Sequence, residues 1–166
     1  MIQDEDLSAR KNKKLSPPEA LAKISRYCAY QERSHQEVKN KLYEYGLRSG
    51  EVDEILTQLI TSGFLNEERF AKAFAGGKFR MKKWGRVKIQ HELQAQGLTR
   101  NCIQRGLDEI DAADYRKTLR QLLKKKAAEL TETNAFKKRD KIARFAIGKG
   151  YEADMVWEYL KDLFPD

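Results

Sequence analysis

The histidines and cysteines are the residues of this sequence best suited to metal binding or catalysis, and their spacing predicts neither. His35 and His91 have no Cys, Asp or Glu partner in a recognisable metal-binding motif. Glu92 follows His91, but the second histidine of a zinc-protease helix is missing, so we expect His91 to be an exposed helical residue. Cys28 and Cys102 are too few and too far apart for a disulfide framework. We expect two buried free thiols in a reducing cytosol.

Two glycine–lysine stretches lack the features of phosphate-binding loops. GGKF (76–79) and GKGY (148–151) do not complete the Gly-x4-Gly-Lys-Ser/Thr pattern, and neither follows a predicted strand. The acidic residues Glu51, Asp53 and Glu54 are best explained as the solvent-facing first turn of a helix. The sequence therefore predicts a protein without enzymatic activity, cofactor or metal.

A run of cations is the strongest candidate for a binding site. From Arg69 to His91 there are eight Lys or Arg and no Asp or Glu. Such a run is either a site for phosphate or for an acidic protein surface, or a solvated surface that happens to be basic. Trp84 either contacts a base or a partner, or pins its turn onto the core of its own unit, which we favour. Arg69 is left out of the site, since it follows a helix cap and can pair with nearby acids.

Two further basic groups lie at 116–126 and 137–144. Lys117, Arg120 and Lys124 share one face of a predicted helix, opposite its leucines. No Arg, Asn or Gln cluster stands at a helix start to read bases, so we expect little sequence specificity. The candidate residues for binding a partner or DNA are Lys78, Arg80, Lys82, Lys83, Trp84, Arg86, Lys88, Lys117, Arg120, Lys124, Lys138 and Arg139.

The composition favours a charged helical protein. Of 166 residues, 40% are hydrophobic and 35% charged, and only three are Pro. Thirty-three Lys and Arg against twenty-five Asp and Glu give a net charge of +8, which favours a polyanionic partner. No signal peptide is evident, and no apolar run approaches the ~18 residues needed to span a bilayer. We expect a cytoplasmic monomer that does not bind membranes.

An apolar pattern that occurs three times must position these residues. It is centred on Gly46, Gly97 and Gly150, which are 51 and 53 residues apart. At offsets −8, −4, +1, +6, +10 and +13 stand Val38, Ile89, Ile142; Leu42, Leu93, Ala146; Leu47, Leu98, Tyr151; Val52, Ile103, Val156; Leu56, Leu107, Leu160; and Leu59, Ile110, Leu163. This spacing predicts an apolar helical stripe, a glycine turn with positive φ, and a second helix.

A further helix precedes each pair, over about 17–31, 66–79 and 112–130. Ser16 and Asn66 are suitable N-caps for the first two of these helices. Ser34 is a suitable N-cap for the middle helix of the first copy, where Glu37 completes a capping box. We therefore predict an all-α fold of three tandem three-helix repeats that form an elongated, curved array. The boundaries are a flexible tail over 1–15 and repeats over 16–63, 64–111 and 112–166.

Parts of the second and third copies are similar to a known family. GFLNEERFAKAF (63–74) with WGRVKIQHELQAQGL (84–98) resembles the signature of the RecX family, and KIARFAIGKGYEADMVWEYL (141–160) resembles its C-terminal unit. The resemblance covers about 20–164. It is specific at Gly63, Leu65, Arg69, Phe70, Ala71, Gly85, Ile89, Leu93 and Gly97. The sequence departs at 83–86, where Lys-Trp-Gly-Arg replaces the common Gly-Tyr-Gly-Pro, so the conformation of this turn is open.

The resemblance implies three three-helix repeats and a regulator that binds the RecA–DNA filament along its helical groove. It implies inhibition of RecA recombinase and co-protease activity, and hence modulation of DNA repair, recombination and the SOS response. Direct binding to single- or double-stranded DNA is the alternative, and a helical scaffold with incidental positive charge is a third possibility.

Overall fold

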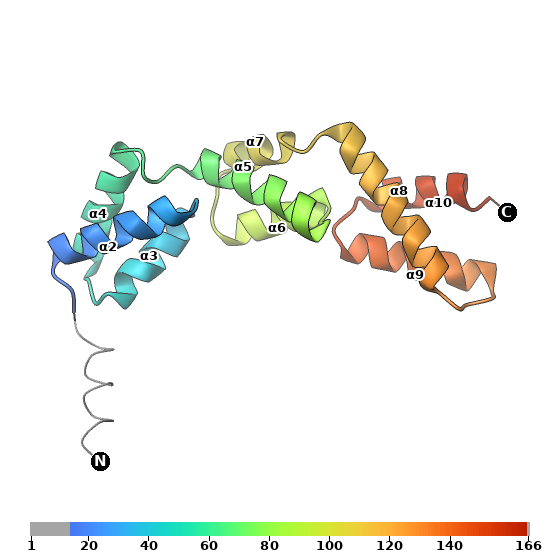
Figure 1. Cartoon of the computed structure of the whole chain (residues 1–166), viewed down its shortest axis with the longest axis horizontal. Coiled ribbons are helices and arrows are strands. Elements are labelled where there is room, and N and C mark those ends of the chain that lie inside the picture. The colour runs from blue at the N-terminus through green and yellow to red at the C-terminus, as the bar shows by residue number, and fades with distance from the viewer. Residues whose placement is uncertain (1–13, 166) are drawn as a thin grey trace, which may run out of the picture. The chain divides into compact units, whose positions relative to one another are not determined.

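The described part of the chain, residues 14–165 of the computed structural model, is entirely helical, with no strand (Figure 1). Its nine α-helices and one π-helical segment are α2 (Pro17–Tyr30), α3 (His35–Glu44), α4 (Ser49–Thr61), α5 (Glu67–Gly77), η1 (Lys78–Lys82), α6 (Arg86–Ala95), α7 (Arg100–Asp108), α8 (Ala112–Glu129), α9 (Ala135–Gly148) and α10 (Ala153–Leu163). The helices form three consecutive triplets, so the predicted fold of three three-helix repeats is confirmed. The residue boundaries between the repeats stay a prediction.

The chain divides into two compact units. Within the described part, unit 1 comprises 14–70 and 96–98, and its helices α2, α3 and α4 pack on one another. Unit 2 comprises 71–95 and 99–165; in it α6 packs on α7, and α8 packs on α9 and α10. Unit 2 therefore contains most of repeats two and three.

The predicted flexible tail falls largely on residues 1–13, which lie outside the described part. Its last two residues are attached to unit 1. The Leu15 N–H donates to the Tyr45 carbonyl at 2.9 Å, and Lys14 pairs with Glu51 at 3.1 Å.

The helix starts follow the predicted caps, with one correction. Ser16 and Glu19 form a reciprocal capping box at α2, and the Asn66 side chain accepts from the Arg69 N–H at 2.8 Å. Ser34 accepts from the Glu37 N–H at 3.1 Å, but the Glu37 carboxylate contacts the Ser34 hydroxyl. The predicted capping box at α3 is therefore wrong in its second half.

The repeated apolar pattern forms the core. Every apolar position of the pattern is buried except Leu56, Leu107 and Leu163, which are half-buried. The central glycines Gly46 and Gly97 have φ of 86° and 79°, in the left-handed region that glycine adopts without steric cost. The spacing read from the sequence therefore identified both the buried stripes and the turns between them.

The predicted helix over 66–79 is wrong at its C-terminal end. The α-helix stops at Gly77, and the chain continues as the π-helical segment η1. Glycine weakens a helix from within, and a Cβ at Gly76 would lie 2.8 Å from the folded-back guanidinium of Arg80. Lys83 then ends η1 with φ 59°, in a left-handed conformation that is uncommon for a non-glycine residue. This is the turn whose conformation the sequence left open.

Candidate partner-binding surface

The second and third repeats are joined in unit 2 by main-chain hydrogen bonds. The Gly85 N–H donates to the Lys149 carbonyl at 2.8 Å, and the Val87 N–H donates to the Gly150 carbonyl at 2.9 Å. These bonds satisfy two N–H groups at the start of α6 that have no partner within the helix. The start of α6 is therefore fixed against the turn between α9 and α10.

The joint requires glycine on both sides. A Cβ on Gly85 would lie 2.3 Å from the Gly150 carbonyl carbon, and a Cβ on Gly150 would lie 2.4 Å from the Lys88 Cβ. Gly150 also has φ 102°, which side chains rarely tolerate. Gly150 thus serves as the turn residue of repeat three and as half of the contact with repeat two.

A polar network built on Tyr115 lies beside the joint. The Tyr115 hydroxyl accepts from the Arg86 backbone N–H at 3.0 Å and donates to the Glu152 carboxylate. The Arg86 guanidinium lies 4.0 Å from the centre of the Tyr115 ring and pairs with Glu152 at 3.0 Å. Burial, reinforced by the bond to Glu152, raises the pKa of Tyr115 well above its usual range. The network therefore keeps this phenol neutral and holds α6, α8 and α10 together.

Two side chains from repeat three bind the end of η1. The Tyr151 hydroxyl donates to the Lys83 carbonyl at 2.9 Å, and the Lys149 ammonium donates to the Lys82 carbonyl at 2.9 Å. The last carbonyls of a helix have no partner within it, so these bonds satisfy two of them. They also fix the backbone that carries Lys82 and Lys83.

A basic cleft of about 390 Å³ lies between η1 and the helices of repeat three. We call it the lysine cleft. It is lined by Met81, Lys82, Lys83, Leu122, Lys125, Lys126, Glu129, Phe145 and Lys149. The lining thus holds five lysines, one glutamate and three apolar side chains. Such a surface attracts anions, and its apolar part offers contact area that a purely electrostatic site lacks.

The four lysines predicted around Trp84 divide into two groups. Lys82 and Lys83 line the lysine cleft. Lys78 and Lys88 instead place their ammonium groups 5.0 and 4.5 Å from the centre of the Trp84 ring. Trp84 is half-buried and meets the Phe74 ring edge-on, with 6.4 Å between centroids. These contacts agree with the interpretation that Trp84 pins the turn to its own repeat.

Neither Arg80 nor Arg86 lines the lysine cleft. Arg80 is exposed, and Arg86 is half-buried. The Arg80 guanidinium folds back over Gly76, and Arg86 forms the network with Tyr115 and Glu152. Arg69, which the sequence left out of the site, pairs with Glu32 and donates to the Gly63 carbonyl at 2.9 Å. Its predicted structural role is confirmed.

The remaining predicted residues do not line the lysine cleft. Lys117, Arg120 and Lys124 are exposed on α8, with the Arg120 guanidinium 4.6 Å from the centre of the Tyr159 ring. Lys138 and Arg139 are half-buried on α9.

Sequence reasoning missed Lys149 and left Lys125 and Lys126 out of the candidate site. Lys125 and Lys126 follow Lys124 directly, so a shift along the same helix would have included them. Lys149 stands just before Gly150, and its role depends on the turn that brings it to η1. Only the contact between repeats reveals it.

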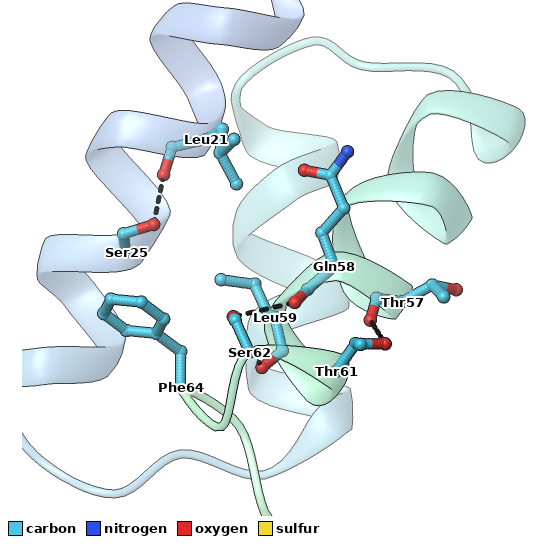
Figure 2. Close-up of a pocket in the computed structure, with 8 residues that line it drawn as sticks. All are labelled: Leu21, Ser25, Thr57, Gln58, Leu59, Thr61, Ser62 and Phe64. Atoms are coloured by element: carbon cyan, nitrogen blue, oxygen red, sulfur yellow. Dashed lines mark hydrogen bonds between the residues drawn. The ribbon is translucent and has the colours of Figure 1, made fainter.

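A second, apolar pocket of about 500 Å³ lies on unit 1 between α2 and the end of α4 (Figure 2). Leu21, Leu59 and Phe64 are its apolar lining residues. The hydroxyls of Ser25, Thr57, Thr61 and Ser62 are set among them. Figure 2 shows three of these hydroxyls bonded to carbonyls of their own helices: Ser25 to Leu21, Thr61 to Thr57 and Ser62 to Gln58. The pocket offers a partly exposed Phe64 and no group arranged for catalysis.

The histidines and cysteines do not form a catalytic or metal-binding arrangement in the described part of the chain. His91 is exposed as predicted, whereas His35 contacts Glu67 at 3.3 Å. Cys28 is buried, but Cys102 is only half-buried, so the prediction of two buried thiols is wrong for Cys102. Among residues 14–165, no cluster of His, Cys, Asp or Glu could hold a metal ion, and no helix is long and apolar enough to cross a bilayer.

Comparisons with known proteins place repeats two and three in one family. Residues 66–107 match the second three-helix domain of RecX, and residues 114–160 match the third. The Regulatory protein RecX of Chlorobium limicola is 28% identical over 151 residues, which cover 90% of this chain and 92% of the relative. That of Pseudomonas savastanoi pv. phaseolicola is 30% identical over 132 residues, which cover 80% and 83%. The crystal structure of RecX from Lactobacillus salivarius has the same fold, with a TM-score of 0.79, 20% identity, and coverage of 89% of this chain and 96% of that chain.

Proposed function

Because the chain belongs to the RecX family, we propose that it is a non-enzymatic regulator that binds the RecA–DNA filament in the cytoplasm and inhibits RecA recombinase and co-protease activity. Modulation of DNA repair and of the SOS response would follow from this inhibition. The observation that carries the proposal is the match of repeats two and three to the RecX domains. The name of the relatives, a regulatory protein, supports a regulatory rather than a catalytic role.

The lysine cleft supports the proposal through its charge. A RecA–DNA filament presents both phosphate groups and protein surfaces, and a basic protein is attracted to such a polyanion. Lys82 and Lys83 extend from a backbone that Tyr151 and Lys149 fix. A fixed backbone reduces the conformational entropy that binding would otherwise cost.

Direct DNA binding is the second candidate, favoured by the net charge of +8 and by the exposed cations of α8. The small three-helix units also resemble DNA-binding helix-turn-helix modules in size. This function needs no protein partner. Each lost phosphate contact would then reduce the slope of log K against log salt by about one.

Co-sedimentation separates these functions. The chain is mixed with preformed RecA filaments on single-stranded DNA, or with naked DNA, and RecA ATP hydrolysis is measured in parallel. Much tighter binding to the filament, together with inhibited hydrolysis, is the expected result. Equal binding to naked DNA would favour direct DNA binding, and binding to neither would overturn both proposals.

A matched pair of charge reversals locates the surface. Lys82→Glu should weaken filament binding, whereas Lys161→Glu, the same change at an exposed lysine of α10, should leave it within about twofold. Arg86 is unsuitable for this test, because its guanidinium also holds the repeats together. Equal binding by the two variants would remove the lysine cleft from the filament site.

A further inference from the structure

We propose that the lysine cleft is a docking site for an acidic peptide segment that carries one large apolar side chain. The inference concerns the chemistry of a protein ligand and does not depend on the RecA filament, because the cleft lies within one compact unit of the isolated chain.

The charge around the cleft selects an anion. Five lysines from η1, α8 and the end of α9 line it, and Glu129 is the only carboxylate among the lining residues. Because these lysines come from three separate elements, a bound segment would meet them from more than one side. Several carboxylates along one peptide can each reach a different lysine.

The apolar side chains of the cleft favour a ligand that carries an apolar group as well as negative charge. Met81 is 82% exposed, and Leu122 and Phe145 lie half-buried beside it. Methionine adapts its shape to different apolar partners, which suits a binding surface. A cleft of about 390 Å³ has room for a leucine side chain, and covering Met81 would remove apolar surface from water.

The aromatic rings near the cleft are poorly placed to stack on nucleobases. The Lys126 ammonium lies 4.7 Å from the centre of the Phe145 ring. Trp84, the nearest indole in sequence to the cleft-lining lysines, has the ammonium groups of Lys78 and Lys88 over its ring. Sites for single-stranded nucleic acids combine a basic groove with open aromatic faces on which bases stack. No arginine lines the cleft to bind phosphate in a bidentate manner. The apolar lining of the cleft, formed by Met81, Leu122 and Phe145, therefore fits an aliphatic side chain of a peptide better than a base.

The walls of the cleft are fixed before any ligand arrives. Lys149 and Tyr151 bind the carbonyls of Lys82 and Lys83, and the main-chain joint at Gly85 lies just beyond them. The gap between η1 and repeat three is thus set by hydrogen bonds that do not involve the ligand. A preformed site loses little conformational entropy when it binds a short segment.

Fluorescence anisotropy on the isolated chain tests the proposal. The probe is a labelled seven-residue peptide with two Asp and two Glu flanking a central Leu. Its controls are the same peptide with Ala in place of Leu, and a labelled single-stranded oligonucleotide. We expect the Ala peptide to bind about tenfold more weakly, since a buried leucine side chain contributes on that order.

Variants of the chain place the site. Lys125→Glu and Met81→Ala should each weaken binding of the Leu peptide severalfold or more, while Lys161→Glu should change it by less than about twofold. Both Lys125 and Met81 are exposed, so neither substitution should unfold the protein, and circular dichroism checks this.

Two results would overturn the proposal. Equal affinity for the Leu and Ala peptides, with no effect of Met81→Ala, would reduce the cleft to a general attraction for anions. Displacement of the peptide by an oligonucleotide that binds more tightly and is equally sensitive to Lys125→Glu would make the cleft a nucleic-acid site.

Discussion

Gly85 lies against Gly150 so closely that a Cβ on the first would stand 2.3 Å from the carbonyl carbon and oxygen of the second. Alanine at either position should therefore push repeats two and three apart. We expect Gly85→Ala and Gly150→Ala each to lower the free energy of unfolding by about 2–3 kcal/mol or more, measured by urea denaturation.

Gly148→Ala is the matched control for this prediction. Gly148 ends α9, and a Cβ there would meet nothing within 4 Å. Alanine is a better helix former than glycine, so this variant should be neutral or more stable by up to about 1 kcal/mol. Similar behaviour of the Gly148 and Gly85 variants would contradict the close contact.

The pairing of Arg86 with Glu152 should be measurable as a coupling between repeats. Both side chains are about one third exposed, so solvent screening weakens the attraction between the two charges. We therefore expect a coupling energy of about 1 kcal/mol in an Arg86→Ala, Glu152→Ala double-mutant cycle. Tyr115→Phe should cost about 1–3 kcal/mol, because the Arg86 N–H and the Glu152 carboxylate both lose a partner. A coupling near zero would mean that the two side chains act independently.

Leu93 tests the core of the second repeat. It is fully buried in α6, at a position of the repeated apolar pattern. Leu93→Ala should lower the free energy of unfolding by about 2–5 kcal/mol, whereas Gln94→Ala at the exposed neighbouring position should be nearly neutral. Thermal denaturation followed by circular dichroism distinguishes the two, and equal stabilities would place Leu93 outside the core.

Alkaline pH should destabilise the protein through two tyrosines. Burial raises the pKa of Tyr115 and of Tyr151 well above the ordinary value of about 10. The neutral phenol is therefore favoured in the folded state. The stability that the two neutral phenols contribute is fully present below pH of about 10. It is lost above that, because the unfolded chain releases these protons first.

The test compares urea midpoints at pH of about 8 and about 11. A double variant that carries both Tyr115→Phe and Tyr151→Phe should lose less stability between the two pH values than the unchanged protein. Tyr30→Phe, at a tyrosine that is 83% exposed, should leave the loss unchanged. An identical loss in all three proteins would assign the alkaline effect to other groups, such as the lysines.

The sequence predicted what depends on local spacing. Val38, Ile89 and Ile142 hold equivalent places in the apolar pattern and all are buried, since a helical stripe has one period wherever it occurs. The π-helical segment was not predicted, because its shape depends on Arg80 folding over Gly76 and on bonds from repeat three.

The candidate site was predicted in part. The sequence identified Lys82 and Lys83 from the charge run, and both line the lysine cleft. It treated Arg86 as another cation of the site, whereas Glu152 and Tyr115 engage it from far along the chain. Charge runs show where cations are concentrated, but the tertiary contacts decide which of them face a ligand.

The main-chain joint has a consequence for folding kinetics. The Gly85 and Val87 N–H groups bond to carbonyls of Lys149 and Gly150, which lie more than sixty residues further along the chain. Bringing such distant segments together costs chain entropy, so we expect the joint to form late in folding, once the helices on both sides exist. Interactions that are absent from the folding transition state affect the unfolding rate. Substitutions at the joint should therefore accelerate unfolding and leave the refolding rate almost untouched.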